Sequence, residues 1–511
     1  VVPRSGADMN REGEFTASYG NFHQGSLQTS LGDHSKKFAW YGSLTANRSD
    51  YGLEPPGPEV FHDRTLGLSA FASLIYDASP KDELRFVGSV RRDYFQVPND
   101  LRRSDTDDAE RENDAFVNFS WVHTFNAKWV LTVSPFYHNN RAEFLGGAND
   151  TPVMAGSDRT SRYAGAQAEA TYLDRRNNVK FGYYGFAQRD DEVFELRGVD
   201  ANGDPLAIEQ RTRPNGSIDA AFVEDQFKPL PWLLLTGGLR FTSFRGGVNE
   251  DSVDPRVGAA VRVPKINICF HGFYGRYYQA PPLTTVSGPL LDFAIQQGFD
   301  FAPLHGERDE EYQFGASLPV KGWLLESDYF HTRAANFFDH NPLANSSIFF
   351  PLTIERVRIR GVEASLTSPL IARRLRISAV YSHQRIEGRG AITGGLTDFS
   401  PADDQWFFLD HDQRNTLNAV ADVHLPRGSW LSGTLRYGSG FLNGEGPDHL
   451  PGHMLVDLAF GHKFGEHWTV SLNTINVMNR RFLLDNSPTF GGVHFSEPRQ
   501  IYLQVRRSFH F

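Results

Sequence analysis

Along most of the chain, apolar and polar residues alternate one by one. In 501–511, Ile501, Leu503 and Val505 alternate with polar residues, and 66–76 repeats the pattern with an apolar residue at every second position. A period of two is typical of a β-strand, whose successive side chains point to opposite faces. The pattern therefore predicts strands that each have one apolar face and one polar face.

We expect roughly 22 such strands of about 9 to 14 residues, enough for tilted strands to cross a hydrocarbon layer. Their connections alternate in length. Short turns are predicted at 126–128, 175–178, 230–231, 264–265, 321–322, 426–428 and 465–466. Long loops are predicted at 145–162, 191–214, 280–309, 338–352, 388–409, 438–449 and 480–497. This arrangement predicts an all-β fold: a transmembrane antiparallel up-and-down β-barrel with short periplasmic turns and long extracellular loops. A soluble β-propeller or β-solenoid is the other interpretation, but no fixed repeat is present.

Tryptophan supports the membrane interpretation. Five of the eight Trp residues begin a predicted strand just after a short turn: Trp129, Trp232, Trp323, Trp430 and Trp468. Indole has an apolar body and a polar N–H, and it favours the boundary between lipid and water.

The amino-acid composition argues against several classes of partner and of structural element. The net charge of −10 argues against a nucleic-acid partner. The single cysteine, Cys269, excludes an intrachain disulfide and a cysteine metal cluster. No apolar run is long enough for a transmembrane helix.

The sequence offers few candidate metal-binding or catalytic residues. The acidic residues of 105–114 offer oxygen ligands that could hold Ca²⁺, but their spacing is not that of an EF-hand, and a solvated loop near lipopolysaccharide is the favoured interpretation. Asp190, Asp191 and Glu192 form a poor catalytic pair, because neighbours on an extended chain point to opposite faces. No hydrolase, zinc-protease or P-loop motif is present. We expect no enzyme activity, no metal site and no cofactor.

Charged and aromatic residues at the predicted outer rim are the candidates for substrate binding. They are Arg276, Tyr277, Tyr278, Gln279, Phe337, Phe338, Asp410, His411, Asp412 and Arg414. Tyrosine and arginine suit stacking on sugars or catecholates and pairing with anions. Three alternatives stay open: the tyrosines are ordinary interfacial aromatics, which is slightly favoured; the charged run pins its loop by internal salt bridges; and the phenylalanines, with Phe349 and Phe350, fold their loop on itself.

Several segments resemble TonB-dependent outer-membrane receptors. Residues 13–22 look like the first barrel strand of that family, and 360–366 contain its mid-barrel G-V-E element. Residues 476–482 resemble its N-hydrophobic-hydrophobic-N-R segment, and 410–417 a D-H-D-Q-R element. Glu497-Pro498-Arg499 with the terminal strand and Phe511 resemble its carboxy-terminal signature. The resemblance spans nearly the whole chain.

The resemblance implies an integral outer-membrane receptor that imports a large, scarce solute such as a ferric siderophore, cobalamin or oligosaccharide. It implies contact with outer-membrane lipid and lipopolysaccharide. The family carries an amino-terminal plug domain and a TonB box, and neither is recognisable here. We therefore expect 1–11 to be the end of a plug-to-barrel connection and 12–511 the barrel, with the TonB complex acting only through the missing plug and box. A passive large-pore channel and a surface adhesin remain alternatives.

Overall fold

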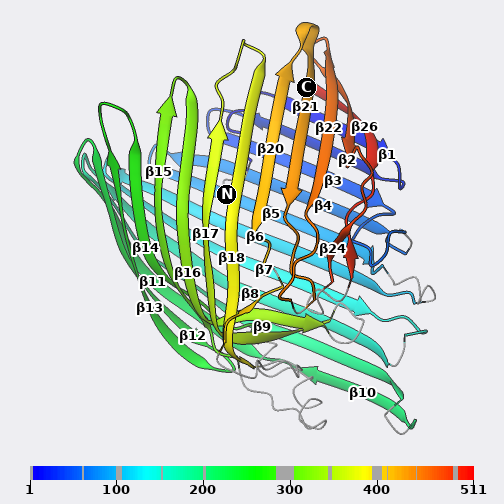
Figure 1. Ribbon diagram of the computed structural model, residues 1–511. Coiled ribbons are helices and arrows are strands. Elements are labelled where there is room, and N and C mark those ends of the chain that lie inside the picture. The colour runs from blue at the N-terminus through cyan, green and yellow to red at the C-terminus, as the bar shows by residue number, and fades with distance from the viewer. Residues whose placement is uncertain are drawn as a thin grey trace.

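The strands form one closed antiparallel barrel, in which β1 lies beside β26 (Figure 1). The computed structural model describes residues 4–59, 62–98, 106–150, 153–199, 203–283, 304–342, 348–393, 405–410, 412–444, 446–486 and 493–511. Within these ranges the main sheet has 24 strands. Two of them, β10 and β19, only extend a neighbouring strand, and the other 22 close the wall. The predicted fold class and strand number are confirmed.

The spanning strands are β1 (Glu12–Gly20), β2 (Gly25–His34), β3 (Phe38–Ser49), β4 (Thr65–Ser79), β5 (Asp82–Gln96), β6 (Ala109–Asn126), β7 (Trp129–Leu145), β8 (Val153–Leu173), β9 (Asn177–Val199), β11 (Asn215–Leu230), β12 (Leu233–Arg245), β13 (Asn249–Arg262), β14 (Cys269–Gln279), β15 (Glu307–Val320), β16 (Trp323–Pro342), β17 (Phe349–Thr367), β18 (Leu375–Thr393), β20 (Asn415–His424), β21 (Ser429–Gly438), β22 (His453–Phe464), β23 (Trp468–Ile475) and β26 (Gln500–His510). The short elements are β10 (Pro205–Thr212), β19 (Phe407–Phe408), the 3₁₀ turn η2 (Pro426–Gly428) and the hairpin of β24 (Leu483–Asp485) and β25 (His494–Phe495).

The first and last strands close the sheet. They pair antiparallel from Glu12 opposite His510 to Gly20 opposite Tyr502. Closure leaves no open edge, so backbone groups at membrane depth find partners within the sheet.

Side chains separate into an outer face and a lumen face. On β4 and β5 the large apolar side chains Leu68 and Val90 are 59% and 55% exposed, and they share a face with Leu66 and Tyr76. A soluble barrel would bury such residues, whereas lipid accommodates them. Among the described residues, no helix is long and apolar enough to cross a membrane.

Several strands run farther than expected. β8 begins at Val153 and β9 continues to Val199, so parts of the predicted loops 145–162 and 191–214 are strand. β18 likewise continues to Thr393 inside the predicted loop 388–409. Above the lipid both faces of a strand meet water, so the apolar period disappears while the hydrogen-bond ladder continues.

The tryptophans divide between the two faces. Trp129, Trp232 and Trp468 are substantially exposed at the short-turn end, as expected of interfacial residues. Trp430 instead lies on the lumen side, because its strand neighbour Leu431 faces outward with Phe460. Its ring covers Gly461 on β22. The interface interpretation is therefore wrong for Trp430.

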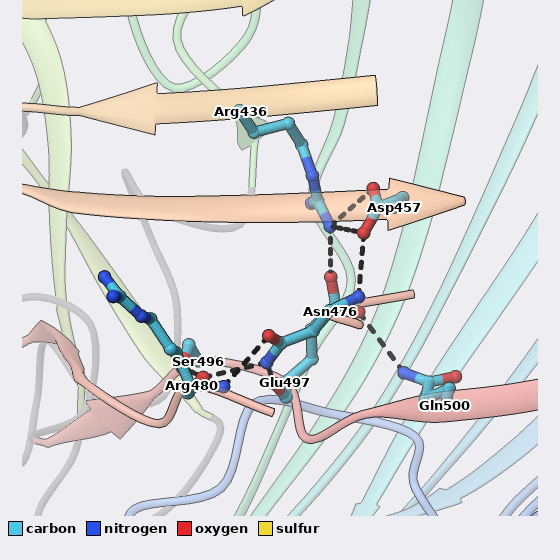
Figure 2. A network of polar contacts seen from close by, with 7 residues as sticks. All are labelled: Arg436, Asp457, Asn476, Arg480, Ser496, Glu497 and Gln500. Atoms are coloured by element: carbon cyan, nitrogen blue, oxygen red, sulfur yellow. Dashed lines mark hydrogen bonds and ion pairs between the residues drawn. The ribbon is translucent and has the colours of Figure 1, made fainter. Parts of the chain in front are cut away.

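A buried polar network joins two segments of the receptor-like signature (Figure 2). Asn476 is fully buried, and its Nδ2 donates to the backbone oxygens of Arg480 and Glu497, at 2.8 Å each. The Arg436 Nη2 lies 3.1 Å from the Asp457 carboxylate and 2.7 Å from that of Glu497. The network fixes the chain between β23 and β26 against the lumen side of β21 and β22.

Candidate functional site

The four candidate residues at the end of β14 lie on different faces of the barrel. Arg276 faces outward, where its Nε donates to the Tyr274 hydroxyl at 3.0 Å. Tyr277 is on the lumen face. Tyr278 donates from its hydroxyl to the Glu250 carboxylate at 2.9 Å, and Gln279 pairs with the first residue of β15. β14 alone therefore does not bring the four residues together into one binding surface.

The two phenylalanines support the barrel rim. Phe337 packs against a buried apolar cluster formed by Ala334, Leu352, Ile354, Val357 and Leu409. The backbone N–H of Phe338 donates to the Glu307 carboxylate at 2.7 Å. Of the two interpretations left open by the sequence, the packing of Phe337 agrees with the one in which the loop folds on itself.

The acidic run before β20 also has internal partners. Asp412 is fully buried and accepts a hydrogen bond from the N–H of Ile386 at 2.8 Å. Its other oxygen lies 2.7 Å from His449 Nε2 and 3.7 Å from Arg414 Nε. Asp412 therefore ties this segment to β18 and to the loop before β22. Asp410 lies two residues earlier in the turn, and His411 lies outside the described residues.

The described part of the acidic run 105–114 enters the wall. Glu110, Glu112 and Asp114 belong to β6, and Asp108 accepts a hydrogen bond from the N–H of Gly147 at 2.7 Å. Burial raises the pKa of the Asp108 carboxyl to about 7. Within the described ranges, no three histidine, cysteine or acidic side chains are grouped so as to hold a metal ion.

A cluster of aromatic rings on the lumen face of β6 to β9 was not predicted. It consists of Phe116, Phe136, His138, Tyr163, Tyr184 and Phe186. The rings of His138 and Tyr163 stack with centroids 5.5 Å apart, and those of Phe136 and Tyr184 with centroids 6.0 Å apart. These strands carry aromatics on both faces, since Tyr137 and Tyr183 face outward, so sequence alternation does not reveal the cluster.

Two arginines lie beside this cluster. A pocket of about 390 Å³ on the wall is lined on the lumen side by Gln167, Tyr184, Phe222, Glu224, Arg240 and Arg256. The Arg256 guanidinium lies 4.6 Å from the ring centroid of Tyr277. Arg240 stands directly opposite Asp254 of β13, whose carboxylate interacts with it, and the Arg240 Nε donates to the Thr242 hydroxyl at 3.2 Å. We call Tyr184, Arg240, Arg256 and Tyr277 the lumen site.

The lumen site combines fixed positive charge with aromatic faces. Guanidinium groups pair with carboxylate and other anionic oxygens, and tyrosine rings stack on planar groups. Among the residues predicted at the rim, only Tyr277 belongs to it. The arginines were missed because a single arginine within a strand gives no sequence signal of the residues that it will meet on neighbouring strands.

Comparison with known proteins agrees with this architecture. Residues 63–477 match the family model described as TonB dependent receptor-like, beta-barrel. The chain therefore belongs to the TonB-dependent receptor family, whose members are transporters of the outer membrane rather than enzymes.

Solved structures share the fold at low identity. The ferric yersiniabactin uptake receptor FyuA from Yersinia pestis is 13% identical, with a TM-score of 0.77 over 98% of this chain and 80% of that one. The siderophore receptor PiuA from Acinetobacter baumannii is 11% identical, with a TM-score of 0.74 over 98% and 81%. The ferripyoverdine receptor of Pseudomonas aeruginosa is 13% identical, with a TM-score of 0.73 over 98% and 72%. A search of curated protein sequences gives no match.

Proposed function

We propose that this barrel imports an anionic metal chelate of the siderophore class through the outer membrane. The observation that carries the proposal is the lumen site, where Arg240 and Arg256 lie side by side with the aromatic rings of Tyr184 and Tyr277. A chelate rich in carboxylate or catecholate oxygens matches both the charge and the rings.

The other solutes fit this site less well. An oligosaccharide gains from stacking on aromatic rings, but a neutral sugar forms no ion pair with the two guanidinium groups. Several structures of the same fold are described as receptors for ferric chelates, among them the uptake receptor for ferric yersiniabactin and the ferripyoverdine receptor. These relatives support a chelate for this chain without specifying which one.

Transport in this family also implies a plug and the TonB complex. We infer that 1–11 continue from a plug domain held within the barrel. The Met9 side chain lies against Gly32, on the opposite face of β2 from the outward Leu31. A chain that enters along the lumen wall is in the right place to connect to such a domain. The same lumen site argues against an adhesin, which would bind through its outer loops, and against a passive pore, which has no need of a ligand site.

The test is uptake of radioactive iron by cells that produce this receptor as their only chelate transporter. We expect accumulation with at least one anionic ferric chelate, and an apparent affinity lowered about 100-fold by R240Q/R256Q, as loss of two charge-assisted contacts requires. R175Q, in the exposed turn between β8 and β9, is the control and leaves uptake unchanged. Uptake that is unaffected by R240Q/R256Q contradicts the proposed site, and strong ion conductance with no chelate uptake contradicts the transport mechanism.

A further inference from the structure

The short-turn end of the barrel is rich in positive charge. All nine lysines of the chain lie in a short turn or within four residues of one, although the net charge of the whole chain is −10. The rest of the chain is therefore correspondingly acidic. The short-turn end is the upper edge of the barrel in Figure 1, where β15 and β20 end.

Three neighbouring turns at this end carry four cations and no acidic residue. They are 321–322 between β15 and β16, 368–374 between β17 and β18, and 425–428 between β20 and β21. The cations are all exposed, and they are Lys321, Arg373, Arg374 and Arg427. We call these four residues the basic turn cluster.

Backbone contacts hold the three turns side by side. The N–H of His424, at the end of β20, donates to the carbonyl oxygen of Arg374 at 2.8 Å. On the other side, a Cβ built on Gly322 would lie 3.1 Å from the Cβ of Pro369, so the first two turns also touch. The four cations therefore belong to one continuous edge of the barrel and not to separate loops.

The basic turn cluster lacks internal compensation. None of its four cations forms an ion pair with a carboxylate in the part of the chain that the structure describes. The contrasting pairs at the long-loop end are Arg111 with Glu143 at 3.5 Å, Arg141 with Asp158 at 2.7 Å, Arg197 with Glu195 at 3.3 Å and Arg211 with Asp191 at 2.6 Å. Like charges on one edge repel one another, and an anion placed between them removes the repulsion.

Exposed apolar side chains beside the cations fix the depth of these turns. Val320 directly precedes Lys321 and is 46% exposed. Leu425 precedes Arg427 by two residues and is 38% exposed, and Leu370 in the middle turn is 44% exposed. Large apolar side chains exposed at each of three neighbouring turns are accommodated by hydrocarbon rather than by water. A soluble protein partner would reach them only by displacing lipid.

The cations lie at the level of the lipid headgroups. One or two residues of chain span at most about 7 Å, and the headgroup layer is about 5 to 7 Å thick on each side of the hydrocarbon. Lys321 and Arg427 are one and two residues from an apolar side chain that faces the hydrocarbon. Such side chains keep their stems along apolar surface and their charges among the headgroups.

We propose that the basic turn cluster is a binding site for an anionic phospholipid of the periplasmic leaflet, such as phosphatidylglycerol. The phosphate lies between the cations of adjacent turns, and the acyl chains lie along Val320, Leu370 and Leu425. A zwitterionic headgroup offers the same phosphate but adds a cation of its own, so the site selects lipids of net negative charge. The site does not depend on which solute the receptor carries.

The experiment measures lipid binding to the purified receptor in detergent by native mass spectrometry. The probes are phosphatidylglycerol and phosphatidylcholine with identical acyl chains. The test variant is K321Q/R373Q/R374Q/R427Q. The matched control is R111Q/R141Q/R197Q/R211Q, which removes the same number of positive charges from the long-loop end. Heat-modifiable migration on gels checks that both variants remain folded barrels.

We expect the unsubstituted receptor and the control to bind phosphatidylglycerol about tenfold more tightly than phosphatidylcholine. The test variant should bind the two lipids within about twofold of each other. Loss of the preference in the control as well would refute the site, and so would equal binding of both lipids by the unsubstituted receptor, a comparison that needs no variant. Displacement of the lipid by millimolar inorganic phosphate would refute a phospholipid as the occupant. The same conclusion would follow if the test variant kept its lipid preference and lost binding to purified peptidoglycan.

Discussion

The Asn476 side-chain amide donates to the backbone oxygen of Glu497 at 2.8 Å, across 21 residues of chain that leave the wall after β23 and return to it in β26. Its Oδ1 accepts from the N–H of Arg480 at 3.0 Å, so both ends of the amide are used. Replacement of a fully buried, fully bonded amide leaves several backbone groups without partners.

We expect N476A to lower the free energy of unfolding by about 2 to 4 kcal/mol, since several buried hydrogen bonds are lost. Urea titration of the barrel by gel mobility measures the change. N178A, at a short turn, is the control and should stay within about 0.5 kcal/mol of the unsubstituted protein. An equal response of the two variants would mean that the network contributes nothing particular to stability.

Glu387 provides the second prediction. Its carboxylate lies 2.7 Å from Arg358, 2.9 Å from Arg385 and 3.6 Å from Arg360. E387Q leaves these three arginines without their shared carboxylate, and a broken buried ion pair costs about 3 kcal/mol or more. Hydrogen exchange should accelerate in the upper parts of β17 and β18. E363Q removes an exposed carboxylate from the neighbouring strand β17 and should leave exchange in both strands unchanged.

Close packing in the lumen gives a third prediction. A Cβ built on Gly461 would lie 2.4 Å from the Trp430 ring, whereas one on Gly237 meets no atom within 4 Å. We expect G461A to destabilise the barrel by about 1 to 3 kcal/mol by overpacking. G237A should be neutral or slightly stabilising, since it only restricts the unfolded chain. The urea concentration at the unfolding midpoint of each variant measures the change in stability. A lower midpoint for G237A than for G461A would contradict the placement of Trp430.

Much of the architecture was predictable because lipid requires an apolar side chain at every second position of a spanning strand. The strands around Leu68 and Val90 show that requirement directly. Strand ends were less predictable, because β8 and β9 continue above the membrane where both faces are polar. The role of Asp412 was not predictable, since its partners Ile386 and His449 are remote in sequence.

The register between strands could not be predicted from the sequence either. Arg360 and Arg385 look like two ordinary strand arginines until their pairing across β17 and β18 is known. The lumen site has the same origin: Arg256 and Tyr277 meet only because β13 and β14 bring them together.

Stacking at the lumen site leads to a fourth prediction. The planar Arg256 guanidinium lies over Tyr277, a geometry that lysine does not reproduce. We expect R256K to weaken chelate binding about tenfold despite the retained charge. Y277F keeps the ring and serves as the control, with binding nearly unchanged. Competition for iron uptake measures both, and full activity of R256K would show that charge alone is sufficient.

Asp63 gives a prediction about pH. Its carboxyl is 2% exposed in the loop before β4, and burial raises its pKa to about 7, although the N–H groups of Leu53 and Gly52 oppose the shift. The folded loop therefore binds a proton more tightly than the opened loop, whose Asp has a pKa near 4. The free energy of opening should fall as pH rises from about 4 to 7 and then level off. Hydrogen exchange of the backbone amides of 50–59, corrected for intrinsic rates, measures the free energy of opening as a function of pH. D63N should remove this pH dependence.

Pairing of β1 with β26 has a consequence for assembly. Contacts such as that between Asn21 and Ile501 join positions 480 apart, so β1 has no permanent neighbour on one side until the far end of the polypeptide has been synthesised and delivered. During that interval its exposed backbone is vulnerable to mispairing. A chaperone or insertion machine that shields one strand edge would therefore act on β1 first and release it last.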